Sequence, residues 1–102
     1  MNISVSAGDP VVVTVGGEVD LGNSASLAAA IGEALEQDAV SSVEVDLGAV
    51  TFLDSSGIAA LLKGRRLADD AGVDYRVTGM HGIVRQVLEL TGVLDHLTGR
   101  SD

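Results

Sequence analysis

The chain has 102 residues, of which 46% are hydrophobic, and this size and composition fit one small domain with a single core. Its 15 acidic and 6 basic residues give a formal net charge of −9, and only two residues are aromatic, so nucleic-acid binding is not expected. The absence of cysteine excludes disulfides, thiol catalysis and thiolate metal sites.

Strand and helix patterns alternate along the chain. Alternating or β-branched apolar residues predict strands, and apolar residues at helical spacing predict helices. The expected strands are 3–6, 11–15, 43–47 and 73–78, and the expected helices are 24–37, a segment that starts near 55, and 83–88. Gly16 and Gly17 are expected to end the second strand, and Ser24 to cap the first helix. This order predicts an α/β sandwich, with a mixed sheet of about four strands and helices packed mainly on one face.

The two ends of the chain carry weaker signals. Gly92 is predicted to end the third helix, with Val93 and Leu94 folding back over its last turn. The N-terminal residues have no basic region followed by a long apolar stretch, and no window approaches the length of a membrane span. We therefore expect a cytoplasmic protein that is not associated with a membrane.

The most informative segment is Asp54-Ser55-Ser56-Gly57, which lies between an apolar strand and an apolar helix. The first N–H groups of a helix have no partner within the helix and favour negative charge. A phosphate on Ser55 would meet these donors, which makes this serine a candidate for phosphorylation. Asp and Ser are also the commonest N-cap residues, so local chemistry alone favours a helix cap over a phosphorylation site.

The segment 43–62, VEVDLGAVTFLDSSGIAALL, resembles the signature of the STAS domain, and in particular of the bacterial family of anti-sigma-factor antagonists. Two further segments agree with this resemblance, namely 17–20 after an early strand and 84–93 near the C-terminus. Together they cover nearly the whole chain in the family's order. The resemblance implies a single STAS domain over residues 1–102, with the α/β architecture described above.

The resemblance also implies a function and a site. Ser55 matches the position that is phosphorylated by an anti-sigma factor with serine kinase activity, and Ser56 is the second choice. In this cycle the unmodified protein binds the anti-sigma factor and frees the sigma factor, and a serine phosphatase resets the phosphorylated form. Gly57 would leave room for the kinase and its ATP. The partner-binding residues implied by the resemblance are Glu18, Asp20, Asp54, Ser55, Ser56 and Gly57.

The resemblance implies no catalytic activity, cofactor or metal, and it leaves the oligomeric state open. Without it, Glu18 and Asp20 fit an ordinary polar turn. A STAS scaffold or transport-associated subunit that is never phosphorylated remains an alternative, because fold does not fix function.

Other classes of protein fit less well. In a receiver domain Asp54 would be the phosphate acceptor, but the chain has no acidic pair after the first strand, and its only lysine, Lys63, lies in a predicted helix. In a hydrolase Ser55 would need a base, and neither His81 nor His96 is placed by sequence to act as one.

Overall fold

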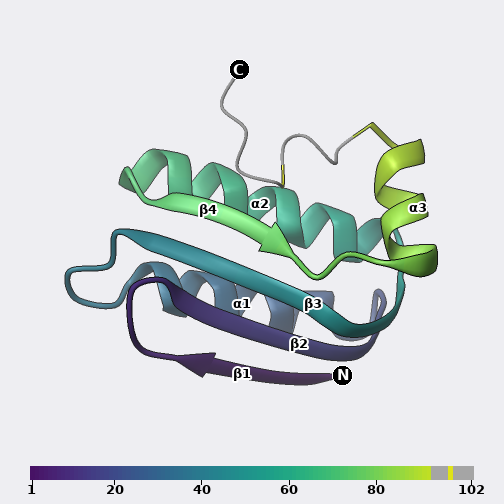
Figure 1. Ribbon diagram of the computed structural model, residues 1–102, viewed down its shortest axis with the longest axis horizontal. Coiled ribbons are helices and arrows are strands. Elements are labelled where there is room, and N and C mark those ends of the chain that lie inside the picture. Colours follow the sequence, from purple (N-terminus) through teal and green to yellow (C-terminus); the bar gives the residue numbers. More distant parts are fainter. Residues whose placement is uncertain (93–96, 98–102) are drawn as a thin grey trace.

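Four strands form one mixed sheet in the computed structural model, which describes residues 1–92 and 97 (Figure 1). Their order across the sheet follows the chain: β1 (Asn2–Ser6), β2 (Val11–Val19), β3 (Ser42–Leu53) and β4 (Asp74–Thr78). β1 runs antiparallel to β2, whereas β2, β3 and β4 are mutually parallel. The carboxyl ends of the three parallel strands therefore lie at one end of the sheet.

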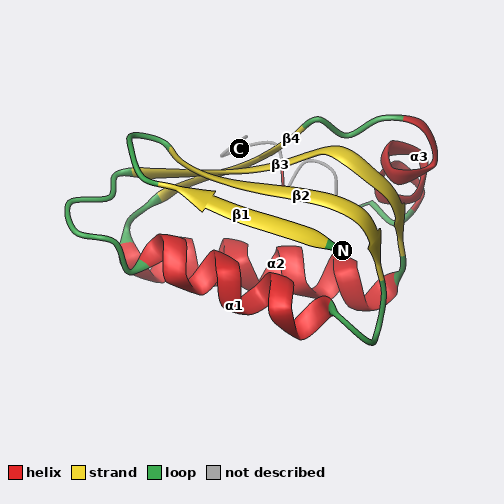
Figure 2. Cartoon of the chain, turned by 90° about the horizontal axis from the view of Figure 1, so that it is seen from below, coloured by secondary structure: helices red, strands yellow, loops and turns green. Residues whose placement is uncertain are grey.

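Two long helices, α1 (Ser24–Leu35) and α2 (Ser55–Ala71), cover one face of this sheet side by side (Figure 2). Each connects two neighbouring parallel strands by a crossover, and such crossovers are right-handed. Because the strands follow one another across the sheet in chain order, both helices lie on the same face. The third helix, α3 (Gly82–Leu90), lies apart from them at the end of the sheet where β3 leads into α2. The predicted α/β sandwich, with helices mainly on one face, is confirmed.

The core lies between the sheet and these two helices. Every second residue of the central strands points toward the helices, as expected for a strand with one covered face. The fully buried side chains include Val13 and Val15 of β2, Val45 and Leu47 of β3, Leu27 and Ile31 of α1, and Leu61 of α2. This packing fixes the ends of β2 and β3 relative to the start of α2, and those ends form the candidate site.

Both central strands extend further than the sequence predicts. Gly16 and Gly17 do not end β2, which continues to Val19, and β3 continues beyond residue 47 to Leu53. Two shifts of register, which fall between Thr14 and Gly16 and between Gly17 and Glu18, keep the strands paired. A Cβ atom at Gly16 would lie 3.2 Å from the Cβ of Ala49, so this glycine allows close approach inside the sheet.

α3 packs on β3 through Val84 and Leu88, which are buried. Gly92 adopts a φ of 76°, which only glycine adopts readily and which agrees with its predicted role as a helix stop. The contact predicted for Val93 and Leu94 lies outside the described residues.

Candidate functional site

The junction between β3 and α2 is built around the carboxylate of Asp54. This residue is the N-cap of α2, with an extended backbone. Its Oδ1 atom accepts hydrogen bonds from the backbone N–H groups of Ser56, at 2.9 Å, and Gly57, at 3.2 Å. Two of the otherwise unpaired donors of the first helical turn are satisfied in this way. The capping interpretation of this segment is therefore correct for Asp54.

The two serines differ in what their side chains do. The Ser56 hydroxyl donates a hydrogen bond of 2.6 Å to Asp54 Oδ1, and the residue is half-buried. Ser55 is exposed, and its hydroxyl makes no hydrogen bond to any other residue within 1–92 or to residue 97. The hydroxyl of Ser55 is therefore free among the described residues, whereas that of Ser56 is engaged.

The charge of Asp54 is stabilised by these contacts. The hydrogen bond from the Ser56 side chain is the largest cause that lowers the pKa of Asp54 below its ordinary value; the backbone N–H groups of Gly57, Ser56 and Leu21 add to it, and partial desolvation opposes it. Asp54 is thus a carboxylate at neutral pH. A phosphate on Ser55 was expected to meet unpaired backbone N–H groups. This expectation is wrong for the N–H groups of Ser56 and Gly57, because both already donate to the Asp54 carboxylate.

The loop from β2 to α1 lies against this junction. Glu18 is paired in the sheet with Phe52, and the N–H of Asp54 donates to the carbonyl oxygen of Val19 at 3.2 Å. Glu18 and Asp20 therefore lie at the same end of the sheet as Asp54. Glu18 is exposed and Asp20 is half-buried. The fold thus brings Glu18, Asp20 and Asp54 to the end of the sheet where Ser55 lies.

Asn23 holds the loop in shape. Its side-chain oxygen accepts from the N–H of Asp20, and its side-chain amide donates to the carbonyl oxygen of Glu18, both at 2.9 Å. Asn23, not the predicted Ser24, is the N-cap residue of α1, but it makes no side-chain bond to the helix. The asparagine stabilises the loop that carries the acidic residues, a role that its sequence position does not reveal.

Gly57 has a different role from the one expected. It is buried, and a Cβ atom at this position would overlap Leu53 Cδ1 and lie 3.0 Å from Val19 Cγ1. The absence of a side chain allows α2 to pack closely on the ends of β2 and β3. The structure therefore gives no surface for a kinase or partner at Gly57, and this part of the expected partner-binding set needs correction.

Two apolar side chains near the site were not expected from the sequence. Leu21, in the loop between Asp20 and Asn23, is 82% exposed, and Phe52, beside Glu18, is 44% exposed. Large exposed apolar residues are informative when they group at a candidate interface. In the sequence, Leu21 could have been noticed as the one apolar residue among turn-forming neighbours, Asp20, Gly22 and Asn23.

The described residues offer little for catalysis. His81 lies at the start of α3, and its Nε2 is 2.8 Å from the carbonyl oxygen of Gly48, so this ring is engaged away from Ser55. Within residues 1–92 and 97, no three His, Cys, Asp or Glu side chains are grouped so as to hold a metal ion. No helix of the same residues is both long enough and apolar enough to cross a membrane.

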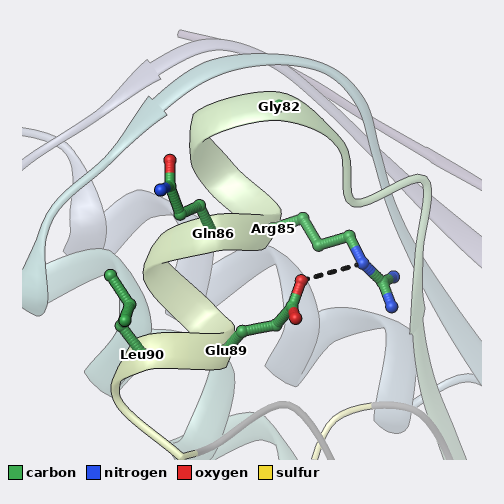
Figure 3. Close-up of a pocket in the computed structure, with 5 residues that line it drawn as sticks. All are labelled: Gly82, Arg85, Gln86, Glu89 and Leu90. Carbon is green, nitrogen blue, oxygen red and sulfur yellow. Dashed lines mark ion pairs between the residues drawn. The ribbon is translucent and has the colours of Figure 1, made fainter.

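A shallow hollow lies on α3, with a volume of about 400 Å³ (Figure 3). It is lined by Gly82, Arg85, Gln86, Glu89 and Leu90. Arg85 and Glu89 form an ion pair of 3.1 Å across one turn of the helix, with both side chains about half exposed. The hollow includes no residue of the Ser55 junction and no nucleophile paired with a base.

Comparison with known proteins agrees with the geometry. A family model described as the STAS domain matches residues 2–102. The anti-sigma factor antagonist SpoIIAA in its unphosphorylated form is 23% identical, with a TM-score of 0.76, over 95% of this chain and 86% of that chain. An anti-sigma factor antagonist from Mycobacterium paratuberculosis is 29% identical, with a TM-score of 0.76, over 94% of this chain and 81% of that chain.

A further similar structure is that of the Bacillus cell fate determinant SpoIIAA in its phosphorylated form. It is 22% identical, with a TM-score of 0.68, and the match covers 95% of this chain and 89% of that chain. At 23% and 22% identity, the two SpoIIAA structures show that this chain shares their fold.

Proposed function

The chain belongs to the STAS domain family, and we propose that it is an anti-sigma-factor antagonist switched by phosphorylation of Ser55. The unmodified protein binds an anti-sigma factor that has serine kinase activity, and this releases the sigma factor. Phosphorylation by the same partner ends the binding, and a serine phosphatase restores it. The protein thus regulates transcription in the bacterial cytoplasm without contacting nucleic acid or membrane. Similarity to an antagonist from Mycobacterium paratuberculosis, and in fold to SpoIIAA, supports this role.

The exposed and unpaired hydroxyl of Ser55 is the observation that carries the proposal. A kinase must bring ATP to an accessible hydroxyl. Ser55 is exposed and its hydroxyl makes no hydrogen bond among the described residues, whereas Ser56 is half-buried and donates to Asp54. Ser55 also lies on a rigid junction, because Asp54 caps the helix and Gly57 packs on the sheet. Modification of Ser55 would therefore change the surface and leave the core intact.

Electrostatics gives a physical reason for the switch. A phosphate adds about −1.5 to −2 charges at neutral pH. It would stand directly beside the Asp54 carboxylate, at the end of the sheet that also carries Glu18 and Asp20, on a chain of net charge −9. The amides that could offset this charge at Ser56 and Gly57 are already bound. An interface fitted to a neutral hydroxyl would then lose affinity through repulsion and desolvation.

Intact-mass measurement after incubation with ATP tests the proposal. The partners to use are the purified anti-sigma serine kinases of the source organism, each with wild type, Ser55→Ala and Ser56→Ala. We expect one phosphate on the wild type and on Ser56→Ala, and none on Ser55→Ala, because only the Ser55 hydroxyl is removed in that variant.

Two results would contradict the proposal. If none of the kinases adds mass to the wild type, the chain is not a phosphorylated antagonist, and the scaffold or transport-associated role becomes the better explanation. If Ser55→Ala still gains a phosphate and Ser56→Ala does not, the chain is a kinase substrate but the modified residue is Ser56.

A further inference from the structure

Leu21 is the most exposed of the large apolar side chains in the described part of the chain, with 82% of its surface open to solvent. We infer that it is an apolar anchor for the anti-sigma factor, inserted into an apolar pocket that is bordered by arginine or lysine side chains. This inference rests on the proposed function and adds to it the chemistry of the partner's surface.

The loop does not need the Leu21 side chain for its own shape. The turn is closed by the N–H of Gly22 donating to Asp20 Oδ1 at 2.9 Å, and by the N–H of Ser24 donating to the Asp20 carbonyl oxygen at 2.9 Å. Asn23 then fixes both Glu18 and Asp20. These bonds use backbone and polar side-chain atoms alone. A polar residue at position 21 would therefore serve the fold as well as leucine.

Leu21 is nevertheless held in a fixed place beside Ser55. The loop follows Val19, whose carbonyl oxygen accepts a hydrogen bond of 3.2 Å from the N–H of Asp54, and the Leu21 N–H adds to the polar groups that lower the pKa of Asp54. The side chain therefore projects from a loop that is hydrogen-bonded before and after Leu21. Binding of a partner would then restrict the loop backbone very little further. A side chain on a preorganised loop loses little conformational entropy when it is buried by a partner.

The charge around Leu21 indicates the kind of partner. Glu18 and Asp20 lie in or beside its loop and Asp54 lies at the adjoining helix start, whereas the first basic residue of the chain, Lys63, lies about two turns further along α2. A partner with basic side chains around an apolar pocket complements both features. A phosphate on Ser55 would then add charge at the edge of the anchored contact, so the anchor and the switch act on the same interface.

Titration of the unphosphorylated protein with each purified anti-sigma serine kinase, without ATP, tests this inference. The variants are Leu21→Asn, which removes the apolar side chain, and Leu21→Met, which keeps it. Leu90→Asn on α3 is the matched control, because Leu90 is 79% exposed. Circular dichroism and thermal melting of each variant report whether the fold is unchanged.

We expect Leu21→Asn to weaken binding by roughly tenfold to a hundredfold, because a buried leucine side chain contributes that much, and Leu21→Met and Leu90→Asn to stay within about threefold of wild type. Equal binding by wild type and Leu21→Asn, or an equal loss in Leu90→Asn, would overturn the anchor while the proposed function stands. Absence of binding by the wild type to every kinase would overturn both.

Discussion

Four successive residues at the start of α2 have four separate roles. Asp54 caps the helix, Ser55 presents a free hydroxyl, Ser56 supports the cap through its own hydroxyl, and Gly57 permits close packing on the sheet. The sequence predicts the group but not the division of roles, because Asp and Ser both serve as caps and only the hydrogen bonds show which one does. The same ambiguity applies to Gly57, since a glycine can serve an unusual backbone conformation, close approach of a partner molecule, or close packing inside the protein.

Replacement of Gly57 by alanine tests the packing role. The added Cβ would overlap Leu53 Cδ1, so the helix or the leucine must shift. Overpacking of this kind costs about 1–3 kcal/mol, and we expect the free energy of unfolding in urea to fall by that amount.

Gly32→Ala is the matched control for this change. Gly32 also lies in a helix, but its added Cβ meets no atom within 4 Å. Alanine there should raise the free energy of unfolding by about 0.5–1 kcal/mol, because glycine disfavours a helix interior. Equal effects of the two substitutions would show that helix propensity, and not contact with Leu53, explains the result at Gly57.

At the scale of elements, the order of strands and helices was predictable from the spacing of apolar residues. Buried apolar residues recur at every second position in a strand and at every third or fourth position in a helix. The lengths of β2 and β3 were not predictable, because Gly16, Gly17 and Gly48 resemble turn residues but lie inside paired strands. Glycine is common in turns and is also found where a strand bulges or another backbone approaches closely. The extra length carries Glu18 and Phe52 to the end of the sheet, beside the junction.

The loop between β2 and α1 is the element whose shape matters most for the site. We expect Asn23→Ala to remove the two hydrogen bonds that fix Asp20 and Glu18, each contributing about 0.5–1.5 kcal/mol. Amide hydrogen exchange of Asp20 and Gly22 should become faster, and affinity for the anti-sigma factor should fall although Asn23 itself carries no charge.

Ser26→Ala is a suitable control for the loop, because Ser26 is an exposed residue of the first turn of α1. Its substitution should leave exchange in the loop unchanged. If Asn23→Ala also leaves the exchange of Asp20 and Gly22 unchanged, the loop is held by its backbone bonds alone, and preorganisation by Asn23 is not part of the mechanism.

At the scale of the whole molecule, the fold provides a rigid frame, and the proposed function depends on one end of it. Parallel strands bring their carboxyl ends together, and this brings a loop near residue 20 beside a helix start near residue 55. The acidic residues of this end were predictable through the family resemblance. The apolar residues Leu21 and Phe52 were not, because exposure is a property of the folded chain.

The central claim is that one phosphate on Ser55 separates a binding state from a released state. The most direct test is to measure the dissociation constant of the same protein for its anti-sigma factor before and after phosphorylation, at an ionic strength of about 0.15 M, where charges within about 8 Å still interact. We predict that phosphorylation weakens binding at least tenfold, which corresponds to about 1.4 kcal/mol. Equal dissociation constants for the two forms would contradict the claim, even if Ser55 is modified.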